Sequence, residues 1–502
     1  MPSFTVVTFG CQMNQHDSER MQEVLRAAGY EEVATADRAD VVVLNTCSVR
    51  EKAEQKLRSE VGRIAVLKRD RPELVIGVAG CVAQQEGEAL LKGMPDVDLI
   101  IGPDNITELP ALLNEVAGGA PPQVRTVFDV AEPRFLSASP LPGAQGPTAF
   151  VTTMKGCDER CTYCIVPHTR GPERYRPSRE IIDEIARLVD AGAREVTLLG
   201  QTVDSYRDPL RLLQPAQRVE SARLEAFGKR TPIEDESEFP ALLRLIASEV
   251  PALRRLRYTS PHPRHLTAAL IAAHRDLPVL ARHVHMPMQS GSDAVLKRMV
   301  RRYTRAEYLE RVGLLRETVP GLSVSTDIIV GFPGETEDDF QATLSAVREV
   351  GFIGVFGFKY SPRPYTPALK LGDDIPEPEK SRRLAALFEL SEGMRRDHLQ
   401  TLVGGVEQVL IEGRSKGGAF TGRTLRNEIV HVDCTDDPTG EIVEVRIDQA
   451  FKHSLAATLL DAKRAKPLVR ATRDADAAAA ASRAPVTQGP HALGPRALPV
   501  VH

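Results

Sequence analysis

The chain has 502 residues, too many for one hydrophobic core, so several domains are expected. Hydrophobic residues make up 42% and charged residues 26%, a balance typical of globular proteins. A formal net charge of −4 excludes a protein that binds polyanions over its whole surface, so any nucleic-acid contact must come from local basic patches. The N-terminus, MPSFTVVTFG, has no positive segment, and no later apolar run reaches the ~18 residues of a membrane span. We therefore expect a cytoplasmic protein without a membrane partner.

The N-terminal part alternates short apolar runs with amphipathic segments. Three runs, FTVVTFG, DVVVLNT and ELVIGVAG, are continuous and rich in β-branched residues, as expected of parallel strands buried on both faces. Each ends at a cysteine: Cys11, Cys47 or Cys81. Between the first two lies DSERMQEVLRAAGY, a predicted helix capped by Asp17 or Ser18. The pattern predicts an open parallel α/β sheet with three thiols at the carboxyl ends of its strands, where such sheets bind ligands.

A stretch rich in Gly, Pro and Ala follows, from about 118 to 147, and is typical of a linker. A second series of strand candidates then begins: AFVTTMKG, REVTLLG, LRRLRYTSP, RHVHMPMQ, LSVSTDIIVGFP and GVFGFKYSP. Helical patterns such as SREIIDEIARLVDAG separate them. Six parallel strands with right-handed crossovers predict a partial (βα)6 barrel, two units short of the usual eight. Residues 205–238 are charged without clear periodicity and predict an inserted loop.

The C-terminal part has a third pattern. VEQVLIEG, GAFTGRT, EIVHVD, EIVEVRID and SLAATLL are short strand candidates separated by turn signals, which predicts a small β-barrel. The last residues are low in complexity and are expected to be disordered. The predicted domains are an N-terminal domain at 1–118, a linker at 119–142, a barrel at 143–396, a small β-barrel at 398–463 and a tail at 464–502.

Three cysteines, Cys157, Cys161 and Cys164, follow the first barrel strand, at the rim where barrel active sites lie. In a reducing compartment cysteines favour metal binding or catalysis over disulfides. A structural zinc site needs four ligands, and His168 is the nearest candidate for the fourth. A 4Fe–4S cluster with three thiolates and one open iron is the favoured hypothesis, and the zinc site is the alternative.

The C-x3-C-x2-C spacing on this strand resembles the motif of the radical S-adenosylmethionine (SAM) superfamily. This resemblance implies that SAM binds the open iron and is cleaved reductively. It places Tyr163 near the adenine of SAM. The turn GFPGE, with Gly331 and Gly334, is then expected to approach the adenosyl part of the cofactor closely.

With the N-terminal trio added, the chain resembles the radical SAM methylthiotransferases, whose plan joins a three-cysteine domain, a radical barrel and a TRAM-type β-barrel. The resemblance implies a second 4Fe–4S cluster on Cys11, Cys47 and Cys81. TFGCQMNQHDSERM and GCDERCTYCIVPHTRGPER resemble members that act on N6-isopentenyladenosine in tRNA. Thr202 and Tyr365 depart from the family pattern, in which Asn and Gly are frequent.

The implied reaction replaces the C2 hydrogen of that adenosine, at position 37 beside the anticodon, with a methylthio group. It consumes two SAM molecules and electrons from a small flavodoxin- or ferredoxin-type protein, and a monomer is expected. One alternative keeps the chemistry but changes the target, to threonylcarbamoyladenosine in tRNA or a ribosomal-protein aspartate. Another is a protein without enzymatic activity, either an electron carrier or a zinc-stabilised RNA-binding protein.

Basic residues are the candidates for RNA contact. Arg170 and Arg174 follow the cluster motif and could hold the cofactor carboxylate or an RNA phosphate. In the C-terminal barrel, the candidates are Arg414, Lys416 and Arg423. Further candidates are two basic clusters and an aromatic residue that could stack on a base: Arg254, Arg255, Arg257, Lys297, Arg298, Arg301, Arg302 and Tyr303.

Overall fold

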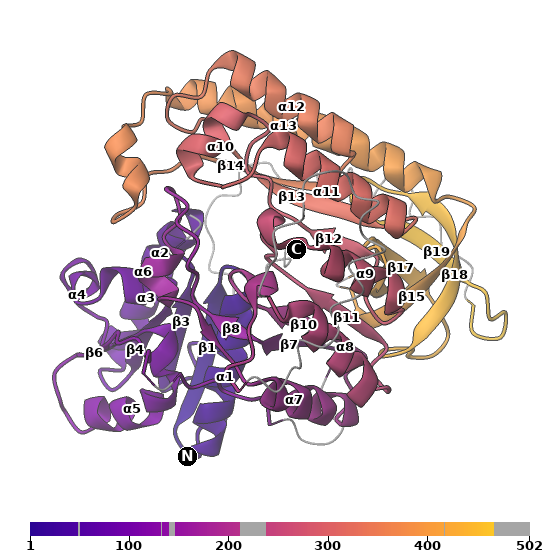
Figure 1. Cartoon of the computed structure of the whole chain (residues 1–502). Coiled ribbons are helices and arrows are strands. Elements are labelled where there is room, and N and C mark those ends of the chain that lie inside the picture. Colours follow the sequence, from indigo (N-terminus) through magenta and orange to yellow (C-terminus); the bar gives the residue numbers. More distant parts are fainter. Residues whose placement is uncertain (49–50, 132, 140–145, 211–236, 416, 466–502) are drawn as a thin grey trace, which may run out of the picture. The chain divides into compact units, whose positions relative to one another are not determined.

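The computed structural model describes residues 1–48, 51–131, 133–139, 146–210, 237–415 and 417–465 (Figure 1). Most of the predicted insertion at 205–238, nearly all of the predicted tail, and Lys416 lie outside these ranges. Contacts divide the chain into two units. The main unit comprises residues 1–398 and 425–427, and the C-terminal unit comprises 399–424 and the described residues from Glu428 onward.

The N-terminal part of the main unit is a six-stranded sheet in the order β2-β1-β3-β4-β5-β6, and every pairing in it is parallel. Its strands are β1 (Ser3–Phe9), β2 (Glu31–Glu32), β3 (Val41–Thr46), β4 (Val75–Gly80), β5 (Leu99–Ile101) and β6 (Gln123–Arg125). Every residue of β3 and β4 is buried, as expected of central parallel strands. The edge strand β6 lies inside the segment predicted as a linker.

Helices cover both faces of this sheet. They are α1 (Gln12–Ala27), α2 (Glu51–Asp70), α3 (Cys81–Glu86), α4 (Ala89–Gly93) and α5 (Leu109–Ala117), with the 3₁₀ helix η1 (Pro103–Glu108). Alternate strand residues point to opposite faces, so Val42 packs in one core with Leu57 of α2, while Val43 packs in another with Met21 of α1.

The predicted cap of the first helix is wrong. The helix α1 begins at Gln12 directly after β1, with Cys11 as its N-cap, so Asp17 and Ser18 lie inside it. Both are buried and serve other contacts: Asp17 pairs with Arg170, and the hydroxyl of Ser18 hydrogen-bonds that of Thr8 at 2.7 Å.

The second part of the main unit holds six parallel strands in two three-stranded sheets, β7-β10-β11 and β12-β13-β14. These are β7 (Thr148–Thr152), β10 (Glu195–Leu199), β11 (Arg255–Tyr258), β12 (His283–His285), β13 (Ser323–Val330) and β14 (Gly354–Lys359). A parallel bridge between Leu256 and Leu280 links the two sheets. All six strands fall in the predicted runs and are adjacent in chain order, so the predicted partial barrel is confirmed.

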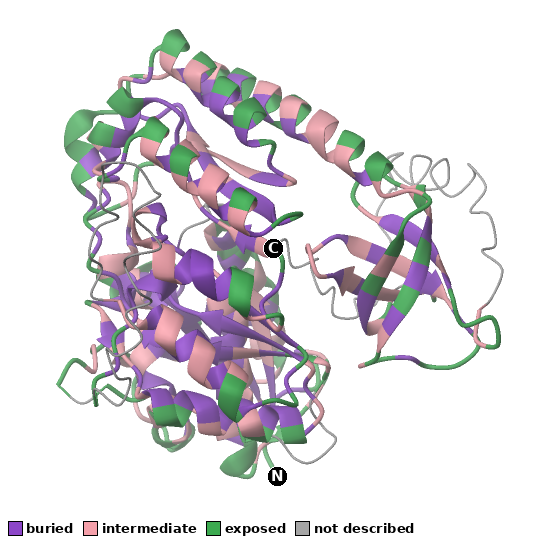
Figure 2. Cartoon of the chain, turned by 45° about the vertical axis from the view of Figure 1, so that its right-hand side comes forward, coloured by how far each residue is buried: buried purple, intermediate pink, exposed green. Residues whose placement is uncertain are grey.

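Helices follow the strands of this barrel. They are α6 (Val166–Arg170), α7 (Ser178–Asp190), α8 (Phe239–Glu249), α9 (Ala268–Asp276), α10 (Asp293–Met299), α11 (Arg305–Thr318), α12 (Glu337–Val350) and α13 (Glu377–Thr401). Short elements lie between them: β8 (Met154–Lys155), β9 (Arg174–Tyr175), η2 (Val203–Ser205), η4 (Pro263–His265) and η5 (Pro367–Leu371). Figure 2 shows mostly buried strands and helices that alternate buried with exposed positions. In the described ranges, no helix is long and apolar enough to cross a membrane.

The C-terminal unit is a closed barrel of five strands in the order β15-β16-β17-β19-β18. They are β15 (Val406–Arg414), β16 (Phe420–Thr424), β17 (Ile429–Asp433), β18 (Ile442–Ala450) and β19 (Leu455–Leu459). Alternate residues such as Val443, Val445 and Ile447 point into its core. All five predicted strands are present, and the parallel pairing of β17 with β19 contributes to the closed barrel.

Candidate functional site

The N-terminal cysteines lie at the carboxyl ends of three strands of the first sheet. Cys11 follows β1, Cys47 follows β3 and Cys81 follows β4, and these three parallel strands are neighbours. Cys11 is exposed, while Cys47 and Cys81 are buried. A hydrogen bond from Cys47 lowers the pKa of the Cys11 thiol to about 6. One thiol of this trio is therefore already disposed toward the thiolate form that binds metals.

Two glycines and two asparagines bring these strand ends together. Gly10 has φ +144°, and a Cβ there would lie 2.5 Å from the Cβ of Cys47. Gly80 has φ +89°, and a Cβ there would collide with the side chain of Asn45. The amide of Asn14 donates to that of Asn45 (3.0 Å), and the thiol of Cys11 donates to Asn14 (3.2 Å). The sequence offered no signal for the two asparagines, because polar residues beside a strand end are common.

The barrel cysteines lie on a loop after β8. The N–H of Cys157 donates to the carbonyl oxygen of Gly171 (3.2 Å), and that of Cys164 donates to the carbonyl oxygen of Cys161 (3.1 Å). Burial raises the pKa of the Cys157 and Cys164 thiols to about 12. Without a cation beside them these thiols hold their protons, and a bound metal would displace the protons. The hydroxyl of Thr202, one of the departures from the family pattern, lies 3.0 Å from the Sγ of Cys157.

Gly156→Ala should prevent this loop from forming. Gly156 has φ +76°, and a Cβ there would collide with the carbonyl oxygen of Pro172. The left-handed backbone alone costs an L-residue about 1–2 kcal/mol, and the collision adds to it. We expect a lower thermal midpoint and a lower content of bound iron. Gly29→Ala is the matched control: Gly29 has φ +86° with nothing within 4 Å of a Cβ, so equal effects of the two changes would contradict the expectation.

The three thiols of each trio do not all lie within 4.8 Å of one another. Among the described residues, only Glu159, His262 and His265 have three ligating atoms all within 4.8 Å of one another. Tetrahedral zinc, with bonds of about 2.3 Å to sulfur, would hold its sulfurs about 3.8 Å apart. His168 is exposed, and its ring packs against Tyr365 with the centroids 5.7 Å apart. Two sets of three wider-spaced thiols, all free of disulfide bonds, fit iron–sulfur clusters better than zinc.

Arg170 and Arg174 are both buried and have partners within the chain, and their contact with an RNA phosphate stays a prediction. The guanidinium of Arg170 donates to Asp17 (2.6 Å) and, through Nε, to the Sγ of Cys81 (3.3 Å). Arg174 is ion-paired with Asp104. Both arginines are buried between the N-terminal sheet and the barrel, where their charges are already paired.

A third buried arginine, Arg301, contacts the barrel trio. It donates through Nη1 to the Sγ of Cys161 (3.4 Å) and through Nε to the hydroxyl of Tyr303 (3.0 Å). Tyr303 is itself buried, so it cannot stack on a base, contrary to the prediction. Arg255 and Arg257 are also buried and both pair with Glu195. Of the predicted basic clusters, three residues remain exposed: Arg254, Lys297 and Arg302.

The residues expected at the cofactor have partners within the chain. Tyr163 lies edge-on to Phe332, with the ring centroids 6.3 Å apart. Gly331 has φ +69°, and the space that its Cβ would take is filled by the side chain of Lys380. Gly334 has φ +72°, and its N–H donates to Asp374 (2.9 Å). Packing inside the chain thus accounts for both glycines without the close approach of a ligand.

In the C-terminal unit, the guanidinium of Arg414 is exposed and lies over the ring of Phe420, 4.0 Å from its centroid. Arg423 is half-buried and pairs with Glu412 at 3.2 Å. Arg414 is therefore the better placed of the two for an RNA phosphate.

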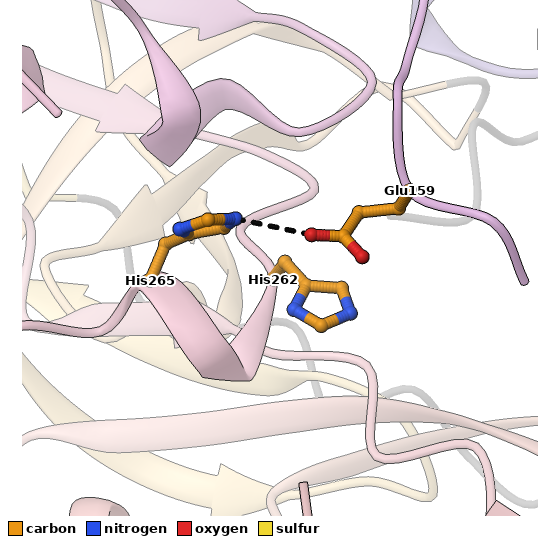
Figure 3. A group of neighbouring side chains, drawn as sticks. All are labelled: Glu159, His262 and His265. Atoms are coloured by element: carbon orange, nitrogen blue, oxygen red, sulfur yellow. Dashed lines mark hydrogen bonds and ion pairs between the residues drawn. The ribbon is translucent and has the colours of Figure 1, made fainter. Parts of the chain in front are cut away.

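No sequence pattern predicted the polar cluster in which Glu159, from the cysteine loop, meets His262 and His265 (Figure 3). Nε2 of His265 is hydrogen-bonded to Glu159 (3.2 Å). Nδ1 of His262 accepts the N–H of Arg264 (3.2 Å), and burial holds the pKa of this histidine well below its usual value. Nε2 of His262 and Oε2 of Glu159 are buried and have no hydrogen-bond partner among the described residues. The guanidinium of Arg302 lies 4.0 Å from the same carboxylate.

Comparison with known proteins places the three parts of the chain. Residues 3–102 match the Uncharacterized protein family UPF0004, 151–347 the Radical SAM superfamily and 400–460 the TRAM domain. A relative from Sorangium cellulosum (strain So ce56), named tRNA-2-methylthio-N(6)-dimethylallyladenosine synthase, is 64% identical over 93% of this chain and 95% of its own length. The chain belongs to this synthase family. The predicted family is thus confirmed.

Other relatives and structures are more distant. Synthases of the same name from Acidithiobacillus ferrooxidans (strain ATCC 53993 / BNL-5-31) and Neisseria gonorrhoeae (strain ATCC 700825 / FA 1090) are 44% and 41% identical. They cover 91% and 92% of this chain and 96% and 100% of their own length. The radical SAM methyltransferase TsrM from Kitasatospora setae has a TM-score of 0.47 and 15% identity over 81% of each chain, which is too remote to inform the chemistry.

Proposed function

We propose that this protein replaces the C2 hydrogen of N6-isopentenyladenosine, at position 37 of tRNA, with a methylthio group. It would use two 4Fe–4S clusters and two SAM molecules per turnover. Support comes from the name of a relative with 64% identity and from the presence of two cysteine trios in one chain. The second trio carries the proposal, because it offers ligands for a cluster in addition to the one that the cysteines of the radical SAM barrel would hold.

The six thiols are the proposed ligands. Cys157, Cys161 and Cys164 would hold the cluster whose fourth iron stays open for SAM, and the N-terminal trio would hold the other. When bound, the cluster and SAM supply one-electron chemistry, which is needed because no base of ordinary pKa removes a hydrogen from an unactivated ring carbon.

The side chains of the protein would bind the barrel cluster, shield it from water and orient its ligands. Cys157 and Cys161 are buried, which keeps water from the reacting centre, and Tyr163 closes one side of the loop by packing on Phe332. The N–H of Arg301 donates to a thiol sulfur of the barrel trio and fixes that side chain. Each contact acts on a proposed ligand or on its surroundings.

The proposed domains are a methylthiotransferase domain at 1–118, a radical SAM barrel at 143–396 and a TRAM-like barrel at 398–463. The predicted linker at 119–142 is only partly a linker, because β6 within it belongs to the first sheet. The TRAM match supports tRNA binding by the last of these. We further propose a monomer in the cytoplasm that takes electrons from a flavodoxin- or ferredoxin-type protein.

Deletion of the gene should remove the methylthio group from tRNA and leave isopentenyladenosine in its place. Mass spectrometry of tRNA nucleosides measures both species, and the intact gene should restore the modification where a Cys157→Ala copy should not. An unchanged profile would refute the proposal. Loss of the methylthio group from threonylcarbamoyladenosine instead, or from a ribosomal-protein aspartate, would show that the substrate is one of the alternatives.

A further inference from the structure

Arg170 belongs to the barrel but acts on the other cysteine trio. It ends α6, six residues after Cys164, yet its Nε donates to the Sγ of Cys81 at 3.3 Å. Its Nη2 donates to Asp17 of α1 at 2.6 Å. One guanidinium therefore joins the segment that carries the barrel cysteines to a thiol of the N-terminal trio.

The geometry of this contact is fixed by its surroundings. Arg170 and Asp17 are both buried, so neither is screened by water. The two donors of a planar guanidinium point in set directions, and the ion pair through Nη2 holds Nε toward the sulfur. The carbonyl oxygen of Arg170 also accepts from Arg174 (2.6 Å), which anchors the backbone of α6.

A buried cation beside a ligand sulfur has a definite electrostatic effect. Reduction adds one negative charge to an iron–sulfur cluster, and hydrogen bonds to its sulfurs stabilise the reduced state. A guanidinium cannot lose its proton at neutral pH, so Nε stays a donor in both redox states. Asp17 balances the charge of Arg170, so the hydrogen bond from Nε to the sulfur carries most of the effect. Arg170 should therefore raise the reduction potential of a cluster bound through Cys81.

We propose that Arg170 is a positioning residue that sets the reduction potential of the N-terminal cluster from the barrel domain. This inference rests on the proposed function, since it takes Cys81 as a cluster ligand. The contact between Arg170 and Cys81 would then help to set how electrons are distributed between the two clusters, because it changes the reduction potential of one of them.

The test is a redox titration followed by electron paramagnetic resonance on anaerobically reconstituted full-length protein. Replacing Cys157, Cys161 and Cys164 with alanine leaves the N-terminal cluster as the sole reporter. In this background Arg170→Gln with Asp17→Asn removes the contact without leaving a buried charge unpaired. We expect reduction to become at least tenfold less favourable, which corresponds to a fall of about 59 mV for one electron.

Two further variants separate this role from simple bridging between domains. Arg174→Gln removes a neighbouring buried bridge that touches no sulfur, while Asp104 keeps its ion pair with Lys155 at 3.0 Å. It also removes the hydrogen bond to the carbonyl oxygen of Arg170, so the potential should move far less than in the Arg170 variants. Arg170→Lys keeps the positive charge but cannot donate to Asp17 and Cys81 at the same time. It should lower the reduction potential by a smaller amount than the double variant. If the double variant does not fold, Arg170→Lys provides the measurement.

The outcomes are distinct. If the potential stays unchanged in both Arg170 variants, or moves equally in Arg174→Gln, Arg170 only bridges the domains and the inference is wrong. If the starting protein binds no iron at the N-terminal trio, the proposed function fails instead, and iron analysis before titration shows this.

Discussion

Replacing Cys157, Cys161 and Cys164 together with alanine should abolish methylthiolation of tRNA and halve the bound iron. The three thiols are the ligands proposed for the barrel cluster, and no other cysteine of the described chain lies on that loop. The variant should also release no methionine from SAM under reducing conditions. Iron and sulfide analysis, nucleoside mass spectrometry and methionine release measure the three effects.

The reciprocal variant separates the two sites. Alanine at Cys11, Cys47 and Cys81 should also halve the iron and stop methylthiolation, but it should leave methionine release intact, because the proposed SAM site is at the other trio. Cys434→Ala is the control: Cys434 is buried in the C-terminal unit, and its thiol donates to the backbone of Asp436, so iron should not change. Loss of all iron from either trio variant would contradict two independent sites.

Local patterns made the cysteine positions predictable. Cys11, Cys47 and Cys81 each follow a continuous apolar run rich in β-branched residues, the pattern typical of a parallel strand buried on both faces. Because these strands are parallel, the thiols that follow them all lie at the same end of the sheet. The same regularity gave the six strands of the barrel and the five strands of the C-terminal unit.

Contacts between domains were not predictable. Arg170 and Arg174 look in sequence like solvent-exposed loop charges, and only the docking of the N-terminal sheet on the barrel buries them against Asp17 and Asp104. The strand β6 was missed for a related reason. Its three residues lie in a Gly- and Pro-rich stretch and become a strand by pairing with β5 at the sheet edge.

Removal of the Glu184 side chain, which joins the two domains, should strongly destabilise the main unit. It is fully buried in α7 and pairs with Arg176, which is also fully buried, and with Arg20 of α1 at 3.5 Å. Glu184→Leu leaves two buried guanidinium groups without their shared carboxylate. Removing one partner from a buried ion pair costs about 3–5 kcal/mol of the free energy of unfolding.

The chain supplies a matched control for this change. Glu180 pairs with the same arginine at 3.3 Å, but its side chain is 54% exposed, so Glu180→Gln should cost less than about 1 kcal/mol. Urea denaturation of the iron-free protein, compared between the two variants, measures the difference. The burial of Glu184 decides the result: because water cannot replace the lost carboxylate there, the two changes should differ several-fold. Equal midpoints would mean that the domains open enough for solvent to reach Arg176.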